Sequence, residues 1–309
     1  SINEARLWDS LMEMAKVGAT EKGGNCRLAL STEDKNGRDL FVKWSTEAGC
    51  DISIDEVGNI FALRKGGQKN EPIIMTGSHL DTQPTGGRFD GVLGVLAGLE
   101  VIKTLNENNI RTDFPLEVVC WTNEEGSRFS PAMMGSGAFV NKFDLKDVLA
   151  KKDITGLTFG DELRRIGYAG CRPLNEKKIR AYFELHIEQG PILEERNKTI
   201  GVVTGAQGQR WHEITIIGRE SHAGPTPMHL RQDALVEASK IIQEVNRIGN
   251  KYQPGACATV GLIEVSPNSR NVIPGQAFIT TDLRHPDDKI LLQMDQDMKN
   301  FCQQLQNEN

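Results

Sequence analysis

Pro72-Ile73-Ile74-Met75-Thr76 is an unbroken apolar run that leads directly into Gly77-Ser78-His79-Leu80-Asp81. Because the run contains β-branched residues, it predicts a buried strand. The polar residues follow at the C-terminal end of that strand, where open α/β sheets place their ligand sites. A second polar run, Gly86-Gly87-Arg88-Phe89-Asp90-Gly91, comes soon afterwards. The segment therefore predicts an α/β fold with a functional site at this edge of its sheet.

The side chains of this segment have the chemistry of a metal site. His79 and Asp90 suit a divalent transition metal, and a carboxylate with two oxygens can bridge two ions. Asp81 follows His79 by two residues, so its carboxylate could accept the other ring N–H of that histidine and fix the tautomer. The alternative for a lone histidine is a hydrogen-bonded core residue beside a turn. Further ligands along the chain decide between the two.

Two more predicted strands end in potential ligands. Pro115-Leu116-Glu117-Val118-Val119-Cys120-Trp121 runs into Thr122-Asn123-Glu124-Glu125-Gly126, and Arg180-Ala181-Tyr182-Phe183-Glu184-Leu185 runs into His186-Ile187-Glu188-Gln189-Gly190. Adjacent carboxylates at a strand end point in different directions, so one can bind metal while the other accepts a proton from water. Alone, such a pair is usually a solvated acidic pair. Three strands that each end in His, Asp or Glu indicate a metal-dependent hydrolytic site.

The composition excludes several classes of function. The net charge of the 309 residues is −6 and no Lys/Arg block occurs, which argues against a nucleic-acid partner. No apolar stretch approaches the roughly 20 residues of a membrane span, and residues 1–8 resemble an amphipathic helix start rather than a signal peptide. The six cysteines form no CxxC pair, which is typical of reduced thiols. We therefore expect a cytoplasmic protein without a membrane partner.

Strand and helix signals alternate as far as residue 208. Helical periodicity covers residues 3–17, 37–49 and 92–105, and a β-hairpin is predicted between Ile52 and Leu63 with its turn at Val57-Gly58-Asn59. This alternation predicts an α/β domain over residues 1–208 with a substantially parallel sheet. The G-x-G-x-x-G spacing of a dinucleotide site is absent.

The pattern changes in the last third of the chain. The elements predicted there are strands at 211–217, 256–265 and 276–284 and helices at 231–249 and 290–305. Their β-α-β-β-α order lacks only a closing strand to complete a ferredoxin-like unit. The sequence thus predicts a second domain over residues 209–309 whose last strand is absent.

The second domain carries residues suited to binding a substrate. His222 lies in a turn-rich loop, Asn271 lies in another loop, and Arg284 comes at the end of a predicted strand. An arginine there can clamp a carboxylate bidentately, and Asn or His can donate hydrogen bonds to a developing oxyanion. The alternatives are a rim salt bridge for Arg284, a turn residue for Asn271 and a loop cap for His222.

Five motifs occur together in the order of a known enzyme family. They are His79-Leu80-Asp81, Gly87-Arg88-Phe89-Asp90-Gly91, Asn123-Glu124-Glu125-Gly126, Glu184-Leu185-His186-Ile187-Glu188-Gln189-Gly190 and His222-Ala223-Gly224-Pro225-Thr226-Pro227-Met228. With them, essentially the whole chain closely resembles the N-carbamoyl-L-amino-acid hydrolase and β-ureidopropionase group of the M20 metallopeptidase-like amidohydrolases, the hydantoinase/carbamoylase type of amidase. Allantoate amidohydrolases are near relatives that match less well around residues 222–227.

The resemblance implies a role for each candidate in the first domain. His79 and His186 would hold one divalent metal ion, and Asp90 would bridge it to a second. Glu125 would bind that second ion, and Glu124 would be the general base acting on water. Zinc, manganese, cobalt and nickel all accept such ligands, so the identity of the metal stays open.

The resemblance also implies how the substrate is held. Gln189, Asn271 and Arg284 would bind it, with Arg284 on its carboxylate. His222 would polarise the carbamoyl oxygen and would do so in the active site of the partner subunit. Asp81 would orient His79.

The implied architecture is a mixed-sheet binuclear-metal catalytic domain with an inserted ferredoxin-like lid and dimerisation domain. The family has a further histidine ligand near the C-terminus, after the chain returns from the lid, and nothing here matches it. We therefore expect a chain truncated at the C-terminus, with the return segment absent.

The expected function is hydrolysis of the carbamoyl amide C–N bond of N-carbamoyl-L-amino acids or N-carbamoyl-β-alanine by a cytoplasmic homodimer. The products would be the amino acid, ammonia and carbon dioxide. Two alternatives stay open. One is a related amidohydrolase acting on allantoate, ureidoglycolate or a dipeptide, and the other is an inactive metal-binding or dimerisation fragment.

Overall fold

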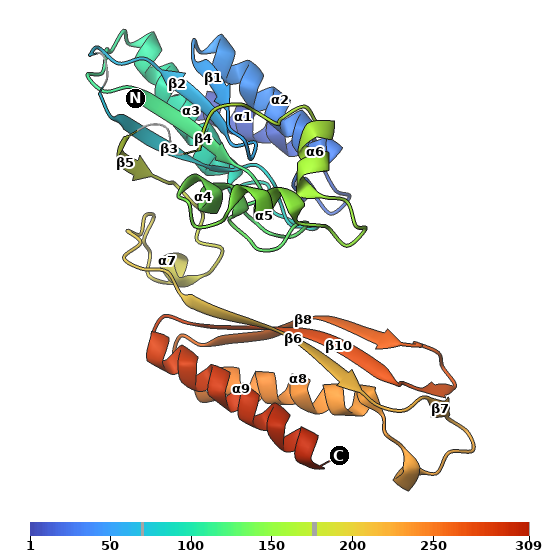
Figure 1. Cartoon of the computed structure of the whole chain (residues 1–309). Helices are drawn as coiled ribbons and strands as arrows, with labels where there is room; N and C mark the ends of the chain where they lie inside the picture. The colour runs from blue at the N-terminus through green and yellow to red at the C-terminus, as the bar shows by residue number, and fades with distance from the viewer. Residues whose placement is uncertain (69–70, 175–177, 309) are drawn as a thin grey trace. The chain divides into compact units, whose positions relative to one another are not determined.

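The chain divides into two compact units, Ser1–Ile192 and Leu193–Asn309, in a computed structural model that describes residues 1–68, 71–174 and 178–308 (Figure 1). The division falls between the last strand of the first unit and the first strand of the second. The sequence pattern predicts this boundary at residue 208, where the strand pattern changes. Periodicity cannot locate a division inside a segment with little regular structure, which accounts for the difference.

The first unit is built on a five-stranded sheet of the order β1-β2-β4-β3-β5. Its strands are β1 (Asp51–Ile54), β2 (Ile60–Arg64), β3 (Ile73–His79), β4 (Leu116–Trp121) and β5 (Ile179–Phe183). β3 pairs in parallel with both β4 and β5, whereas β1, β2 and β4 pair antiparallel in succession. The prediction of a mixed α/β sheet is confirmed, and the C-terminal ends of β3, β4 and β5 meet at one edge.

Helices pack around this sheet, and the buried apolar side chains of the unit form one large cluster and one smaller cluster. The helices of this unit are α1 (Glu4–Lys16), α2 (Thr32–Glu47), α3 (Val92–Glu107), α4 (Met134–Phe139), α5 (Leu145–Ala150) and α6 (Phe159–Arg165), and the short α7 (Ile192–Glu195) crosses the division. α3 lies directly on β3 because Gly94 has no side chain. A Cβ added there would meet the carbonyl oxygen of Leu185 at 2.6 Å and the Cβ of Ser78 at 2.8 Å. The close approach fixes the start of α3 beside the end of β3.

The turn between β1 and β2 is closed by a buried carboxylate. Oδ1 of Asp55 accepts the backbone N–H of Val57 at 3.1 Å and that of Asn59 at 2.8 Å, while Oδ2 accepts the Asn59 side-chain amide at 2.8 Å. Burial raises the pKa of Asp55 to about 6, and the hydrogen bonds from Asn59 and Val57 only partly oppose it.

We expect Asp55 to make the free energy of unfolding fall as the pH rises. Its folded-state pKa of about 6 exceeds the ordinary 3.8, so the folded chain holds this proton more tightly than the unfolded chain. The resulting stabilisation is fully present below the ordinary pKa of 3.8 and is lost as the pH rises through the folded-state pKa of about 6. The full difference is on the order of 3 kcal/mol.

Urea unfolding of the protein and of an Asp55→Asn variant, at about pH 4.5 and about pH 8, measures this effect. The unfolding free energy of the protein relative to the variant should decrease between the two conditions. An identical pH dependence for both chains would contradict the assignment.

The second unit is a three-stranded antiparallel sheet of the order β6-β10-β8 with two helices on one face (Figure 1). Its elements are β6 (Gly208–Ile217), β7 (Ser221–His222), the 3-10 turn η1 (Met228–Leu230), α8 (Ala234–Lys251), β8 (Cys257–Ser266), β9 (Val272–Ile273), β10 (Gln276–His285) and α9 (Asp288–Glu308). Ile241 and Val245 of α8, Met294 of α9 and Leu283 of β10 share its core. The predicted β-α-β-β-α order is present, with the small β7–β9 pair in addition.

No helix within the described ranges combines the length and the apolar character that a membrane crossing requires.

Candidate metal centre

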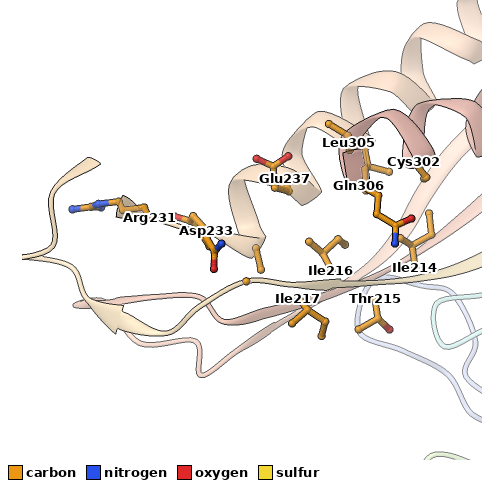
Figure 2. Close-up of a pocket in the computed structure, with 14 residues that line it drawn as sticks. Ile214, Thr215, Ile216, Ile217, Arg231, Asp233, Glu237, Cys302, Leu305 and Gln306 are labelled. Atoms are coloured by element: carbon orange, nitrogen blue, oxygen red, sulfur yellow. The ribbon is translucent and has the colours of Figure 1, made fainter. Parts of the chain in front are cut away.

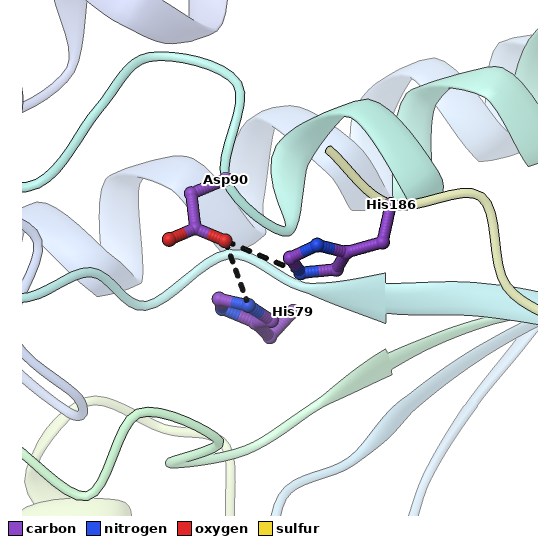
Figure 3. Close-up of side chains that lie close together, drawn as sticks. All are labelled: His79, Asp90 and His186. Carbon is purple, nitrogen blue, oxygen red and sulfur yellow. Dashed lines mark ion pairs between the residues drawn. The ribbon is translucent and has the colours of Figure 1, made fainter. Parts of the chain in front are cut away.

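Three potential metal ligands converge at the edge where β3 and β5 end. His79 is the last residue of β3, Asp90 lies just before α3, and His186 follows β5. Their ligand atoms all lie within 4.8 Å of one another. Oδ1 of Asp90 is 3.8 Å from Nε2 of His79 and 3.2 Å from Nε2 of His186, so one carboxylate faces both rings (Figure 3). Two imidazoles and a carboxylate are a ligand set that divalent transition metals accept.

The charges of these three groups are coupled. The hydrogen bond from His186 lowers the pKa of Asp90, and the same bond raises the pKa of His186 to about 9. Burial acts to lower the pKa of His79, but the carboxylates of Asp81 and Glu124 outweigh it and raise that pKa. The cluster therefore attracts positive charge, whether a proton or a metal ion. Metal binding must displace the protons, since only neutral imidazole coordinates.

His79 is oriented by Asp81, though through the backbone. Nδ1 of His79 lies 2.8 Å from the carbonyl oxygen of Asp81 but 4.0 Å from its carboxylate. The carboxylate instead accepts the backbone N–H groups of Glu124 and Glu125, both at 3.2 Å. Asp81 thus links the end of β3 to the loop after β4.

Both glutamates of that loop lie beside the cluster. Oε2 of Glu124 is 3.4 Å from Nε2 of His79, and about a third of this side chain, 32%, is exposed. Oε2 of Glu125 accepts a hydrogen bond from Gln83 at 3.1 Å. Its other oxygen, Oε1, is buried and has no hydrogen-bond partner within the part of the chain that the structure describes. A buried carboxylate oxygen without a hydrogen-bond partner is suited to bind a metal ion, because the cation would supply the missing partner.

Two further sets of contacts lie at this edge of the sheet in the first unit, one made by Gln189 and one made by a hydrogen-bond network around Glu184. The side-chain amide of Gln189 donates to Oδ2 of Asp90. Glu184 accepts hydrogen bonds from Ser78 at 2.5 Å and from the Tyr182 hydroxyl at 2.7 Å, and Tyr182 accepts one from Trp121 at 3.0 Å. This network ties the ends of β3, β4 and β5 together. Sequence reasoning assigned it no role, although Glu184 stands two residues before His186.

The remaining candidates belong to the second unit. His222 in β7 and Asn271 just before β9 lie together, because the Ala223 N–H donates to the Asn271 carbonyl at 2.9 Å. Arg284 lies at the other end of β10, where its guanidinium donates to both carboxylate oxygens of Asp282. The side chains of His222, Asn271 and Arg284 are exposed.

A cavity of about 600 Å³ lies in the second unit, between the edge of β6 and the ends of α8 and α9 (Figure 2). Its lining includes the apolar side chains of Ile214, Ile216 and Ile241 and the charged side chains of Arg231 and Glu237. None of the candidate site residues lines it. It offers no ligand set of the kind that the first unit assembles.

The chain is similar to known proteins over most of its length. The family model described as peptidase family M20/M25/M40 matches residues 75–285. An N-carbamoyl-L-amino-acid amidohydrolase of Rhizobium meliloti is 51% identical over 286 residues, which cover 93% of this chain and 69% of that protein. An allantoate amidohydrolase of Bacillus subtilis is 36% identical over 94% of this chain and 71% of its own length.

A solved structure is similar over almost the whole chain. It is the crystal structure of an amidase of the hydantoinase/carbamoylase family from Burkholderia vietnamiensis, which aligns with a TM-score of 0.96 at 57% identity. The alignment covers 99% of this chain and 74% of that one.

Proposed function

Since this chain belongs to peptidase family M20/M25/M40, we propose that it hydrolyses the carbamoyl amide bond of N-carbamoyl-L-amino acids in a metal-dependent reaction. One water is consumed for each substrate, and the products are the amino acid, ammonia and carbon dioxide. The observation that supports this most directly is the convergence of His79, Asp90 and His186 with the Glu124 carboxylate beside them. Metal-assisted hydrolysis uses a metal site with a base beside it, as in this arrangement.

In this proposal the chain's own residues would hold two divalent ions. His79, His186 and one oxygen of Asp90 would hold the first, while the other oxygen of Asp90 and the unpartnered Oε1 of Glu125 would serve the second. A bound divalent ion would supply a Lewis acid that polarises the carbamoyl group and acidifies water. Zinc, manganese, cobalt and nickel are all compatible with these ligands.

Glu124 would hold the proton of the attacking water at Oε2. This oxygen is close to the histidine cluster, and the Glu124 side chain is partly exposed, as a general base requires. The proton would then pass to the leaving nitrogen, so the carboxylate returns to its starting state. Asp81 keeps both loop glutamates in place through its two backbone hydrogen bonds.

The second unit would bind the substrate as a lid and dimerisation domain. In this proposal Gln189 and Asn271 hold the substrate, Arg284 binds its carboxylate, and His222 donates to the carbamoyl oxygen of a substrate held by the partner subunit of a homodimer. All six cysteines are unpaired, which supports a cytoplasmic location.

Ammonia release from a panel of N-carbamoyl-L-amino acids, N-carbamoyl-β-alanine and allantoate tests the proposal. The protein is assayed with zinc or manganese and again after chelation. We expect metal-dependent release, fastest from N-carbamoyl-L-amino acids. Faster release from allantoate would assign the chain to the other activity found among its relatives, and no release from any of them would refute the proposal.

Removing the Arg284 guanidinium should weaken catalysis only for substrates with a carboxylate. We expect Arg284→Ala to lower kcat/KM for an N-carbamoyl-L-amino acid by about 10- to 100-fold, the worth of a charged hydrogen bond. The same substrate with its carboxylate converted to an amide should lose less than about threefold. Arg210→Ala is the control, because Arg210 is an exposed arginine on the neighbouring strand, directly across from Leu283. Equal losses on both substrates would contradict the carboxylate clamp.

A further inference from the structure

The loop from Thr122 to Gly135, which includes the first two residues of α4, carries both glutamates of the candidate site, and its two arms are hydrogen-bonded to each other. The Gly135 N–H donates to the Thr122 carbonyl at 2.9 Å, and the Met133 N–H donates to the Glu124 carbonyl at 2.7 Å. Asn123 adopts a left-handed backbone conformation with φ of 53°. The direction in which Glu124 and Glu125 point therefore depends on how the base of this loop is held.

Asn59 holds that base from a different part of the chain. Its Oδ1 accepts the backbone N–H of Thr122 at 2.9 Å, and its Nδ2 donates to the carbonyl of Gly135 at 3.0 Å. One amide thus bonds to both arms of the loop. The same Nδ2 donates to Asp55, which fixes the amide's orientation. The fit is close, since a Cβ on Gly135 would lie 2.2 Å from Oδ1 of Asn59.

A second buried group acts on the same residue of the loop. Arg38 of α2 is fully buried and donates from Nη2 to the Thr122 hydroxyl at 3.2 Å. Its Nη1 donates to the carbonyl of Gly58 at 2.8 Å, and its Nε donates to Asp34 at 2.8 Å. Burying a guanidinium is costly, and an apolar side chain would pack the same space at less cost. Two polar groups from separate elements therefore converge on Thr122.

We propose that Asn59 is a positioning residue for the metal-dependent reaction: it clamps the base of the 122–135 loop so that Glu125 faces the ligand cluster and Glu124 faces the attacking water. The part that concerns Glu124 rests on the proposed function, whereas the part that concerns Glu125 requires only metal binding. The turn itself does not need this side chain, because Asp55 already bonds to the backbone N–H groups of Val57 and Asn59.

A matched pair of variants separates positioning from stability. Asn25 is also fully buried and its amide donates to two carbonyls, those of Ala15 at 2.8 Å and Val17 at 3.1 Å. Asn25→Ala should therefore cost stability for the same reason as Asn59→Ala. Thermal unfolding, calorimetric titration with zinc alone, and kcat and KM are measured for both variants.

We expect both variants to lower the unfolding temperature, and only Asn59→Ala to weaken zinc binding, by about 10- to 100-fold. It should also lower kcat by at least about tenfold with KM changed far less, since a misplaced base affects the reaction step. Equal effects of both variants on zinc binding and kcat would overturn the inference. Should Asn59→Ala fail to fold, Asn59→Ser against Asn25→Ser gives the same comparison. If the unmodified protein releases no ammonia but the zinc affinities still differ, the proposed function fails and the positioning of Glu125 stands.

Discussion

Replacing Glu124 with glutamine is expected to lower kcat for an N-carbamoyl-L-amino acid by about 10²- to 10⁴-fold while metal binding is retained. The carboxylate lies 3.4 Å from Nε2 of His79 and is partly exposed, so water can reach it. Glutamine has nearly the same shape but cannot take up a proton. Asp81 bonds to the backbone N–H of residue 124, and this contact does not depend on the side chain.

The test compares kcat and zinc titrations of the protein, Glu124→Gln and Glu56→Gln. Glu56 is an exposed glutamate in the β1–β2 turn and serves as the surface control. We expect zinc affinity within about threefold for all three proteins, because Glu124 is the base rather than a ligand in the proposed function. Turnover by Glu124→Gln near the level of the Glu56→Gln control would show that another group is the base.

The elements that carry the site could be predicted from the sequence, because each begins or ends at a clear signal. Apolar runs rich in β-branched residues mark β3 and β4, and the ligand candidates follow them directly. Parallel pairing then brings the ends of neighbouring strands to one edge, which is why His79 and His186 meet although they are far apart along the chain. The geometry of parallel sheets makes this convergence predictable from sequence order.

The hydrogen bonds that support the site could not be predicted from the sequence in the same way. Asn59 and Arg38 bond to Thr122 across 63 and 84 residues. An asparagine after a glycine in a hairpin already has a local explanation as a turn residue, and an arginine on an amphipathic helix is normally at the surface. For Asp81, sequence spacing indicated proximity to His79 but not that its carbonyl, rather than its carboxylate, makes the contact.

Asp90 should be the most sensitive residue for metal binding, since its Oδ1 faces both histidines, while its Oδ2 accepts the Gln189 amide and keeps a further lone pair. We expect Asp90→Asn to weaken zinc binding by well over about 100-fold, because it removes a ligand and the negative charge that offsets the ion. Asp81→Asn should weaken it by about 10- to 100-fold, the effect of losing a group that holds ligands rather than being one.

The expected difference in zinc affinity between Asp90→Asn and Asp81→Asn distinguishes a metal site from an ordinary hydrogen-bonded cluster. Calorimetric titration with zinc or manganese, together with metal content after dialysis, gives the affinity and the stoichiometry for the protein and both variants. If the cluster had no metal role, Asp81→Asn would destabilise the protein more than Asp90→Asn. Asp81 is the more deeply buried of the two carboxylates and bonds to two backbone N–H groups. Asp81→Asn would then lower the unfolding temperature more than Asp90→Asn, and zinc binding would not differ between the two variants. A larger effect of Asp90→Asn on zinc affinity, with a smaller effect on unfolding, requires that the Asp90 carboxylate itself contacts the ion.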